Sequence, residues 1–450
     1  MQKQAANTEA LFTDAPPMKV FLSLSLPVIL GMIVTLIYNM VDTYFVGQLG
    51  DPNQMAAVSL CSPLFMLLMG LGNIFGISGS SVVSRLMGQK KADLVRRASA
   101  MCFWVSLIVG IVLAAVLLLG RETLLTLLGA ADDTRAYTGM YAVCFLCGTP
   151  VMLVQFTLLN LLRCDGAARE SMLGSVLGSV VNMILDPIFI FSMKLGVAGA
   201  AIATVIGNLC AVLFFLYAIL RRTPSLSIRL EDFRLDPGLL GSVIAIGLPA
   251  SITNALTSVA TVMMNNLLIA HGISAVAAMG IALRINQIIV LLQIGFAAGL
   301  PPVIGYNWGA GNMARLRQLL RAAVVFSLIL GIALTAASFL FAPDAVRIFM
   351  DHEDIVARGT QLLRALMLCG PFMGVLFIIT NFFQATGKAL PALLLSLCRQ
   401  GFVFFAVLYP MNSLFGWNGL VYAQPAADYI TLLIAIGLFS FTALPALRRR

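Results

Sequence analysis

Residues 174–187 read GSVLGSVVNMILDP and lie inside an apolar segment that is long enough to cross a bilayer. As a helix, this stretch aligns Gly174, Gly178, Asn182 and Asp186 on one stripe, because residues four positions apart lie above one another. A carboxylate at that depth is costly unless it faces a cavity or a partner, so Asp186 is a functional candidate. The small residues on the same stripe would let a neighbouring helix come close.

The composition around this stretch is that of a membrane protein. Of the 450 residues, 60% are hydrophobic and only 10% are charged, and the mean hydropathy is +0.97. A water-soluble globule with a polar surface is therefore excluded. The polar first 17 residues are followed by a membrane-length segment without a small-residue cleavage site, so we expect no removable signal peptide. The eight cysteines lie mostly in apolar segments and are expected to be buried structural thiols, and no cofactor is expected.

Twelve apolar segments of membrane length follow one another along the chain. At about 20 residues per span, we place them at 20–45, 55–82, 97–119, 137–161, 170–192, 196–220, 239–269, 275–304, 319–341, 358–383, 390–412 and 418–444. The sequence therefore predicts an all-α polytopic membrane protein with twelve transmembrane helices.

The basic residues predict the orientation of these helices. The N-terminus, every second loop and the C-terminus together hold 20 of the 28 Lys and Arg residues, whereas the opposite loops hold five. Cytoplasmic loops retain Lys and Arg, so both termini should be cytoplasmic in a multi-pass plasma-membrane protein. The formal charge of +9 mostly reflects this bias, and nucleic-acid binding is a poor interpretation of it.

An internal repeat divides the chain into two halves. Shifting it by about 221 residues lays LPVILGMIVTLIYNMVDTYFVG over LPASITNALTSVATVMMNNLLIA and aligns Gly88 with Gly309 and Pro150 with Pro371. Six helices per half give both halves the same orientation, so we expect two pseudo-symmetric six-helix lobes with a central cleft, built for alternating access. The predicted segments are an N-terminal cytoplasmic tail 1–19, an N-lobe 20–220, a cytoplasmic linker 221–237, a C-lobe 238–444 and a basic tail 445–450.

Several motifs resemble those of the MATE (multidrug and toxic compound extrusion) transporters. They are LPVILGMIVTLIYNMVDTYFVGQLG in the first helix, the Asn182 and Asp186 pair, GVAGAAIAT at the sixth helix, and GFAAGLPPVIGYNWGAG in the second half. The resemblance covers about residues 15–445. It implies a two-lobed antiporter that exports organic, often cationic, compounds in exchange for H+ or Na+.

The acidic residues inside the spans predict the coupling site. Asp42 and Asp186 lie near the outer ends of two helices that run in the same direction, so they share one layer with Asn182 and with Thr204 of the sixth helix. Their oxygen donors suit a small hard cation such as Na+, and burial beside a like charge would equally favour a protonated carboxyl. The resemblance assigns the cation site to these four residues, and Tyr141 is a weaker match. The structural alternatives are that Asp186 caps a kinked helix end and that Asp42 braces the outer mouth.

Other residues are candidates for the cleft and for a hinge. Pro27 could kink the first helix when Asp42 changes charge, although a static kink is equally consistent with the sequence. Arg284 could line the cleft or be a structural cation bound by helix carbonyls, and the role of Asp428 stays open. The residues that we expect along the substrate cleft are Thr35, Asn160, Ser179, Met183 and Arg284.

The sequence thus predicts a monomeric, cation-coupled antiporter that exports organic drugs or metabolites, with H+ and Na+ both open. One alternative is a flippase for a lipid-linked precursor, which would need several cations along its cleft to bind phosphate. An intramembrane aspartate enzyme is a weaker alternative, because the chain lacks GxGD and HExxH motifs. The glycine stripe of residues 174–187 is expected to admit the first helix with Asp42 and the sixth helix with Thr204.

Overall fold

The computed structural model describes residues 2–269, 271–350 and 352–448, and helices make up most of them. A short helix, α1 (Gln2–Thr13), comes first. The first half then contains α2 (Pro17–Gly47), α3 (Pro52–Gly88), α4 (Ala92–Leu119), α5 (Arg121–Leu127), α6 (Asp132–Cys147), α7 (Thr149–Cys164), α8 (Ala168–Pro187), the π-helix η1 (Ile188–Ser192) and α9 (Gly196–Arg222).

The second half repeats this order after a linker that contains the 3-10 turn η2 (Leu230–Asp232). Its elements are α10 (Pro237–Ile269), α11 (Ile273–Ala298), α12 (Pro301–Gly309), α13 (Met313–Phe349), α14 (Glu353–Met367), α15 (Gly370–Ala385), α16 (Ala389–Leu397), the π-helix η3 (Cys398–Phe402), α17 (Val403–Phe415), α18 (Trp417–Thr442) and α19 (Leu444–Arg448).

The predicted membrane spans coincide with these helices. Within the described residues, nine helices are long and apolar enough to cross a bilayer, and counting two bent helix pairs as one span each gives eleven. The 33-residue helix α10 occupies the predicted span at 239–269. The prediction of an all-helical membrane protein is therefore confirmed.

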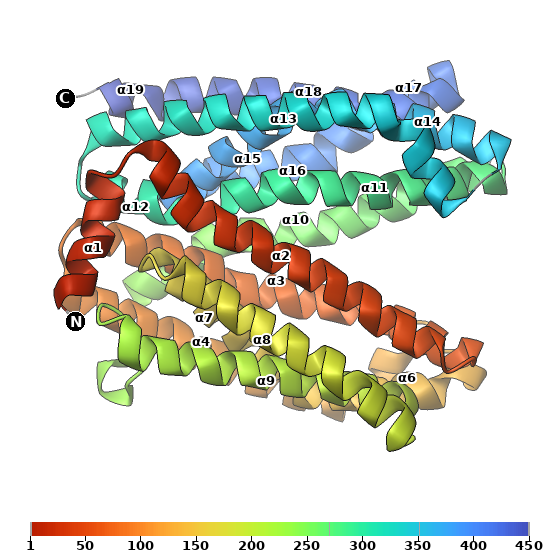
Figure 1. Cartoon of the computed structure of the whole chain (residues 1–450), viewed down its shortest axis with the longest axis horizontal. Coiled ribbons are helices and arrows are strands. Elements are labelled where there is room, and N and C mark those ends of the chain that lie inside the picture. The colour runs from red at the N-terminus through yellow and green to blue at the C-terminus, as the bar shows by residue number, and fades with distance from the viewer. Residues whose placement is uncertain (1, 270, 351, 449–450) are drawn as a thin grey trace.

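The two halves share their irregularities as well as their helix order. The helices α6 and α7 meet at a bend of 51°, and the equivalent helices α14 and α15 meet at 46°. A π-helix also occurs in the fifth span of each half, but at different places: η1 ends the span in the first half, whereas η3 interrupts it between α16 and α17 in the second half. In Figure 1 the helices α3 to α9 form one group and α10 to α19 form the other, and α2 runs from the second group toward the first. Both chain ends lie at the end of the molecule that carries α1, α12 and α19, called the terminal end below (Figure 1).

Hydrogen bonds between the two groups lie at the terminal end and near the middle of the helices. Ser81 Oγ donates to Gln384 O (2.5 Å) and Arg85 Nη1 donates to Thr386 O (3.3 Å). Nearer the middle, Ser251 Oγ donates to Gly70 O (2.6 Å), and Ser25 Oγ of α2 donates to Phe296 O of the second group (2.9 Å). From there the two groups diverge toward the opposite end (Figure 1).

Two glycines related by the repeat allow this close approach. A Cβ atom on Gly88 would lie 2.0 Å from the carbonyl oxygen of Tyr306, and one on Gly309 would lie 2.1 Å from that of Arg85. Shifted by 221 residues, Gly88 becomes Gly309 and Arg85 becomes Tyr306, so the contact is pseudo-symmetric. The helices α3 and α12 therefore cross with their backbones in contact, as small residues permit.

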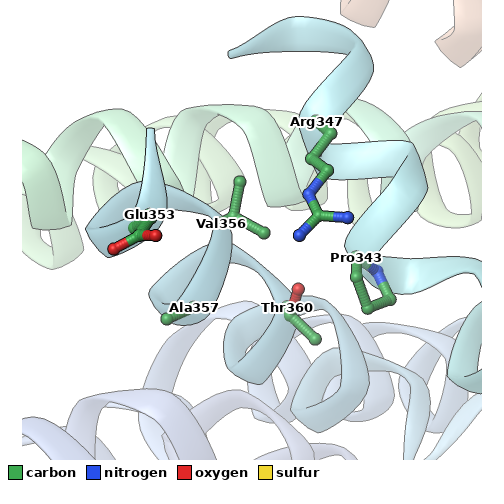
Figure 2. A pocket seen from close by; sticks show the side chains of 6 residues that line it. All are labelled: Pro343, Arg347, Glu353, Val356, Ala357 and Thr360. Carbon is green, nitrogen blue, oxygen red and sulfur yellow. The ribbon is translucent and has the colours of Figure 1, made fainter. Parts of the chain in front are cut away.

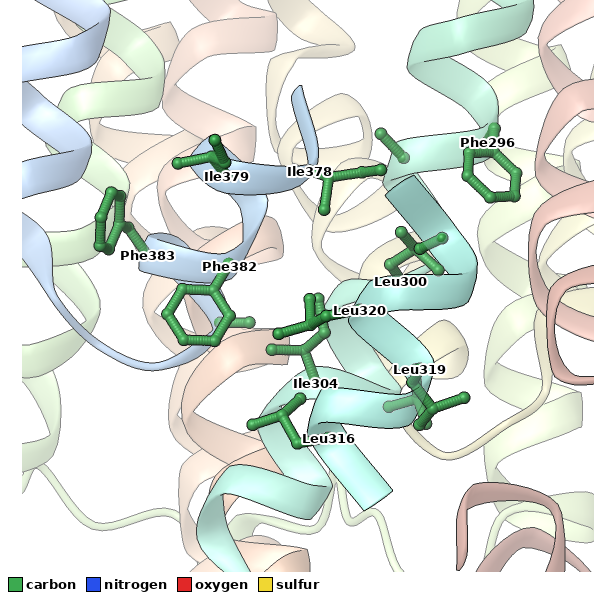
Figure 3. Close-up of a cluster of buried hydrophobic side chains, with 14 of the residues drawn as sticks. Phe296, Leu300, Ile304, Leu316, Leu319, Leu320, Ile378, Ile379, Phe382 and Phe383 are labelled. Carbon is green, nitrogen blue, oxygen red and sulfur yellow. The ribbon is translucent and has the colours of Figure 1, made fainter. Parts of the chain in front are cut away.

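An apolar core fills the second group at the terminal end (Figure 3). Phe296, Leu300 and Ile304 pack there against Phe382 and other side chains of α13 and α15. Residues of the first half join the same core: Phe21 of α2 meets Phe296 with ring centroids 5.4 Å apart. The start of α2 is thus anchored on the second group, which explains its diagonal course.

The helix α1 bridges both groups at the terminal end. Phe12 is fully buried against Tyr306, with ring centroids 5.4 Å apart. The backbone oxygen of Phe12 accepts hydrogen bonds from Asn307 Nδ2 (3.2 Å) and Arg315 Nε (3.4 Å). On the other side, Thr8 Oγ1 donates to the backbone oxygen of Asp165 (3.2 Å). Part of the predicted N-terminal tail is therefore a docked helix.

Replacing Phe12 by Ala should undock α1. Truncating a buried Phe costs about 3–5 kcal/mol, and about 3 kcal/mol corresponds to a roughly 100-fold shift in a local opening equilibrium. Amide hydrogen exchange across residues 2–13, measured by mass spectrometry, should accelerate by that factor. Glu9→Gln is the matched control, because the exposed Glu9–Lys90 ion pair (3.5 Å) contributes little. Unchanged exchange in Phe12→Ala would contradict the docking role.

Candidate functional site

The predicted cation-site residues come together between four helices of the first group. Asp42 lies on α2, Asn182 and Asp186 on α8, Thr204 on α9 and Tyr141 on α6. Asp186 is fully buried and Asn182 is 2% exposed, while Thr204 and Tyr141 are 8% and 9% exposed. The helices α2, α8 and α9 pack against one another along this layer.

The amide of Asn182 links Asp186 to Thr204. The amide forms the most hydrogen bonds when its nitrogen faces Asp186 and its oxygen faces Thr204. Nδ2 then donates to Asp186 Oδ2 (3.2 Å), and Oδ1 accepts from Thr204 Oγ1 (3.2 Å) and Thr204 N (3.0 Å). An amide oxygen and a carboxylate are thereby held in fixed positions on neighbouring turns of α8. The i and i+4 spacing that the sequence displays is what puts them side by side.

The carboxyl groups of Asp42 and Asp186 lie within hydrogen-bonding reach of each other. Two ionised carboxylates repel at such a distance, so the pair needs a proton or a small cation between its oxygens. Asp42 Oδ1 is buried and has no hydrogen-bond partner among the described residues. A buried acceptor without a donor is costly, and binding a cation or a proton removes that cost.

Tyr38 also belongs to this layer and was not among the predicted site residues. Its hydroxyl group lies near the Thr204 side chain and the carboxyl groups of Asp42 and Asp186. Tyr38 precedes Asp42 by four residues on α2, so the spacing that aligned Asn182 with Asp186 could have identified it. Tyr141, the weaker candidate, stacks on Phe145 with ring centroids 5.9 Å apart and forms an aromatic wall near the carboxyl pair.

The glycine stripe of α8 faces α9. A Cβ atom on Gly178 would lie 2.7 Å from Gly207 O, and one on Gly174 would lie 2.1 Å from the Phe215 ring. The expectation that the stripe also admits the first helix needs correction, because α2 packs on α8 beside the stripe and reaches the layer through the longer side chains of Asp42 and Tyr38. The stripe instead allows the α8–α9 contact that brings Thr204 to Asn182.

The residues predicted to line a substrate cleft are spread over α2, α7, α8 and α11. Ser179 is 9% exposed, Met183 is half-buried and Thr35 is exposed. Asn160 is half-buried, and its Nδ2 donates to Phe156 O (2.9 Å). None of these placements by itself assigns a substrate contact.

The structure also shows where the cleft candidate Arg284 and the hinge candidate Pro27 lie. Arg284 is exposed on α11, and no carbonyl among the described residues accepts a hydrogen bond from it, as the structural alternative would require. Pro27 lies inside α2, which continues as one helix from Pro17 to Gly47.

A surface hollow of about 300 Å³ lies elsewhere, between α13 and α14 in the second group (Figure 2). Its lining includes Arg347 and Glu353, and in Figure 2 the side chains of Arg347, Val356 and Thr360 surround a shallow space while Glu353 lies to one side. Because it shares no helix with the carboxyl layer, it is a separate feature.

Comparison with known proteins places the chain in a family. The MatE family model matches residues 27–188 and again residues 249–409, once in each half. The multidrug export protein MepA of Staphylococcus saprophyticus is 32% identical over 425 residues, which is 94% of each chain. An outward-facing multidrug resistance MATE family transporter of the MOP superfamily has a TM-score of 0.90 at 26% identity, with 98% of this chain and 99% of that chain covered. A MATE structure in the straight conformation has the same TM-score, identity and coverage.

The family model covers more than half of the chain, and the relatives match it over almost its full length. The two matched segments of the family model also correspond to the two repeated helix groups. This chain therefore belongs to the MatE family and is a secondary transporter, not an enzyme.

Proposed function

We propose that this protein is a cation-coupled exporter of organic drugs or metabolites that works by alternating access. The observation that carries the proposal is the Asp42–Asp186 carboxyl pair, which leaves Asp42 Oδ1 buried without a hydrogen-bond donor among the described residues. Such a pair binds a proton or Na+ favourably, and its affinity for the ion depends on how the surrounding helices are arranged. A site of this kind can couple an ion gradient to a conformational change.

The coupling ion would be held by the oxygens of Asp42, Asn182, Asp186 and Thr204. These hard donors suit Na+ without a rigid octahedral cage, and a shared proton satisfies the same two carboxyl groups. Binding of either ion removes the repulsion between the two carboxylates and draws α2, α8 and α9 together. Pro27 interrupts the hydrogen-bond ladder of α2 on the way to Asp42 and would serve as its hinge.

The two helix groups supply the moving parts. We propose an N-lobe of residues 20–220 and a C-lobe of residues 238–444, joined by the linker 221–237. The hydrogen bonds between the groups lie at and toward the terminal end, and that end holds most of the loop Lys and Arg residues, which is typical of a cytoplasmic side. With the terminal end on the cytoplasmic side, the proposed state is outward-facing: the cation enters and the substrate leaves.

The substrate class is supported by the relatives. MepA is a multidrug export protein, and the chain is similar to it over nearly its full length. The Asp42 layer also favours positively charged substrates, because a cation in the cleft would compete with the coupling ion for the same carboxylates. We therefore propose organic cations and amphipathic compounds as cargo at the plasma membrane.

A flippase for a lipid-linked precursor is less well supported. It needs several free cations along the cleft, whereas Arg399 is already bound to Asp428 (Nε to Oδ1, 3.2 Å). Of these two arginines only Arg284 has a charge that Asp428 does not already balance, which is too little for a diphosphate group.

Transport by the purified protein in liposomes tests the proposal. A fluorescent organic cation such as ethidium is followed while a Na+ gradient or a pH gradient is imposed separately. We expect movement of ethidium against its own gradient under one of the two conditions. If neither gradient drives movement, the proposal fails. If only one does, that ion is the coupling ion and the other is excluded.

A further inference from the structure

The second lobe contains its own buried ionic site, at the place that corresponds to the α8–α9 contact of the first. Shifted by 221 residues, Gly178 and Gly207 become Arg399 and Asp428. In the first half these glycines bring two backbones into contact, since a Cβ atom on either would lie within 2.7 Å of the other's carbonyl oxygen. In the second half, the same positions hold a guanidinium and a carboxylate that form an ion pair.

The backbone around Arg399 is shaped to hold this side chain. Arg399 belongs to the π-helix η3, and Gly401 within it has non-helical dihedral angles (φ −124°, ψ −111°). π-helical turns inside α-helices are frequent at functional sites. Irregular backbone at membrane depth is tolerated where it is buried in protein or lines a water-filled cavity.

Two contacts fix the guanidinium plane of Arg399, and a third fixes the carboxylate that it binds. Nε donates to Asp428 Oδ1 (3.2 Å), and that carboxylate is 6% exposed. Gln424 Nε2 donates to the same oxygen (3.1 Å) and so fixes the carboxylate in turn. On its flat face the guanidinium lies over the Phe377 ring, 5.0 Å from the centroid.

These contacts leave one edge of the guanidinium available. Neither Nη atom of Arg399 donates a hydrogen bond to a described residue, and its side chain is 21% exposed. The two Nη atoms form the fork that binds a carboxylate or a phosphate bidentately. With Nε anchored and the plane stacked, the fork is pre-organised, so little rotamer entropy is lost when an anion binds.

The depth of Arg399 limits what can reach this fork. It is the eleventh residue of its span, which starts at Ala389, so it lies about 15 Å along the helix at 1.5 Å per residue. That is about the middle of a hydrocarbon core roughly 30 Å thick. A lipid headgroup stays at the interface, whereas a transported molecule passes this level.

We propose that the Nη edge of Arg399, held by Asp428 and Phe377, binds the carboxylate of a zwitterionic organic substrate. The acidic layer of the N-lobe takes the cationic end of such a molecule, and the Arg399 fork takes its anionic end. The inference extends the proposed function, on which it rests, by adding a substrate class and a subsite in the C-lobe.

The test uses a matched pair of probes: a rhodamine dye with a free carboxylate and the methyl ester of the same dye. Their affinities for the purified full-length protein in nanodiscs are measured by fluorescence polarisation and expressed as an acid-to-ester ratio. Arg399→Gln should lower this ratio at least tenfold. Excess acetate should weaken binding of the acid to the wild type and leave binding of the ester unchanged.

A second variant guards against misfolding. Arg399→Gln leaves the buried Asp428 carboxylate without its partner, which can destabilise the fold. The double variant Arg399→Gln with Asp428→Asn removes both charges and should lower the ratio by the same factor. Arg364→Gln is the matched control, because Arg364 is a C-lobe arginine whose Nη2 donates to Phe339 O. The acid-to-ester ratio of this variant should equal that of the wild type.

A ratio that stays at the wild-type value in the folded double variant would overturn the carboxylate subsite, and so would acetate that weakens both dyes equally. The gradient experiment with ethidium uses only the wild type and a substrate without a carboxylate. Failure of the subsite and failure of the antiport proposal are therefore distinguishable.

Discussion

Replacing Asp186 by Asn should reduce gradient-driven export by about 100-fold, because a coupling free energy of about 3 kcal/mol is lost with the charge. Asp186 is fully buried, shares its layer with Asp42 and is oriented by Asn182. Asn keeps the shape of the side chain but does not titrate and binds cations weakly. The ion would then bind both conformations with similar affinity, and a ligand without differential affinity shifts no equilibrium.

The measurement is ethidium transport in liposomes under the effective gradient, compared with ethidium binding at equilibrium. We expect accumulation against the gradient to be lost in Asp186→Asn, whereas ethidium binding should weaken only in part, because the Asp42 carboxylate remains in the layer. Asp42→Asn should behave in the same way, because its carboxyl group is the other half of the pair. Asp344→Asn, an exposed change on α13, is the control and should transport at the wild-type rate. Wild-type accumulation by both site variants would show that the pair has only a structural role.

Replacing Gly88 by Ala should open the terminal end of the molecule. A Cβ atom there would lie 2.0 Å from Tyr306 O and 2.8 Å from Ala310 N, both of which are backbone atoms that cannot rotate away. Overpacking of this kind costs about 1–3 kcal/mol or more. Since the strain exists only while the lobes are in contact, it should shift the conformational equilibrium toward opening by up to about 100-fold. Gly309→Ala should have the same effect through the pseudo-symmetric contact with Arg85.

Spin labels on the two lobes would report this opening. Exposed positions Asp93 on α4 and Ala314 on α13 suit the labels in a background without the native cysteines. Double electron–electron resonance should show a longer distance population in Gly88→Ala. Gly437→Ala is the control, because its Cβ atom would meet nothing within 4 Å. Distances that match the control in both glycine variants would mean that the crossing adjusts without opening.

The candidate cation site was predictable because local spacing and span depth are both visible in the sequence. Asn182 and Asp186 share a helix face by their spacing, and Asp42 reaches their level because its helix runs in the same direction. Tyr38 was equally accessible by the four-residue spacing, but a tyrosine near the end of an apolar helix is not costly in the way that a carboxylate is. It therefore gave no signal until Thr204 was placed beside it.

The partners of the glycine stripe and of Arg399 could not be predicted in the same way. A stripe of small residues indicates a close neighbour without identifying it, and only packing showed that Gly178 meets Gly207 of α9. Arg399 and Asp428 are 29 residues apart and lie on different helices, so their pairing depends on how η3 bends against α18. The docking of Phe12 likewise depends on a pocket formed by residues about 300 positions later.

The sequence by itself determined the membrane class, the repeat, the places of the spans and the layer of the two carboxylates. These follow from hydropathy, periodicity and the cost of a charge in the bilayer, all of which act along a single helix. The tertiary structure decided which helix faces which, where the two lobes touch and which charges are paired. Those outcomes depend on side-chain packing between segments that are distant in the chain, where shape complementarity rather than local composition selects the neighbour.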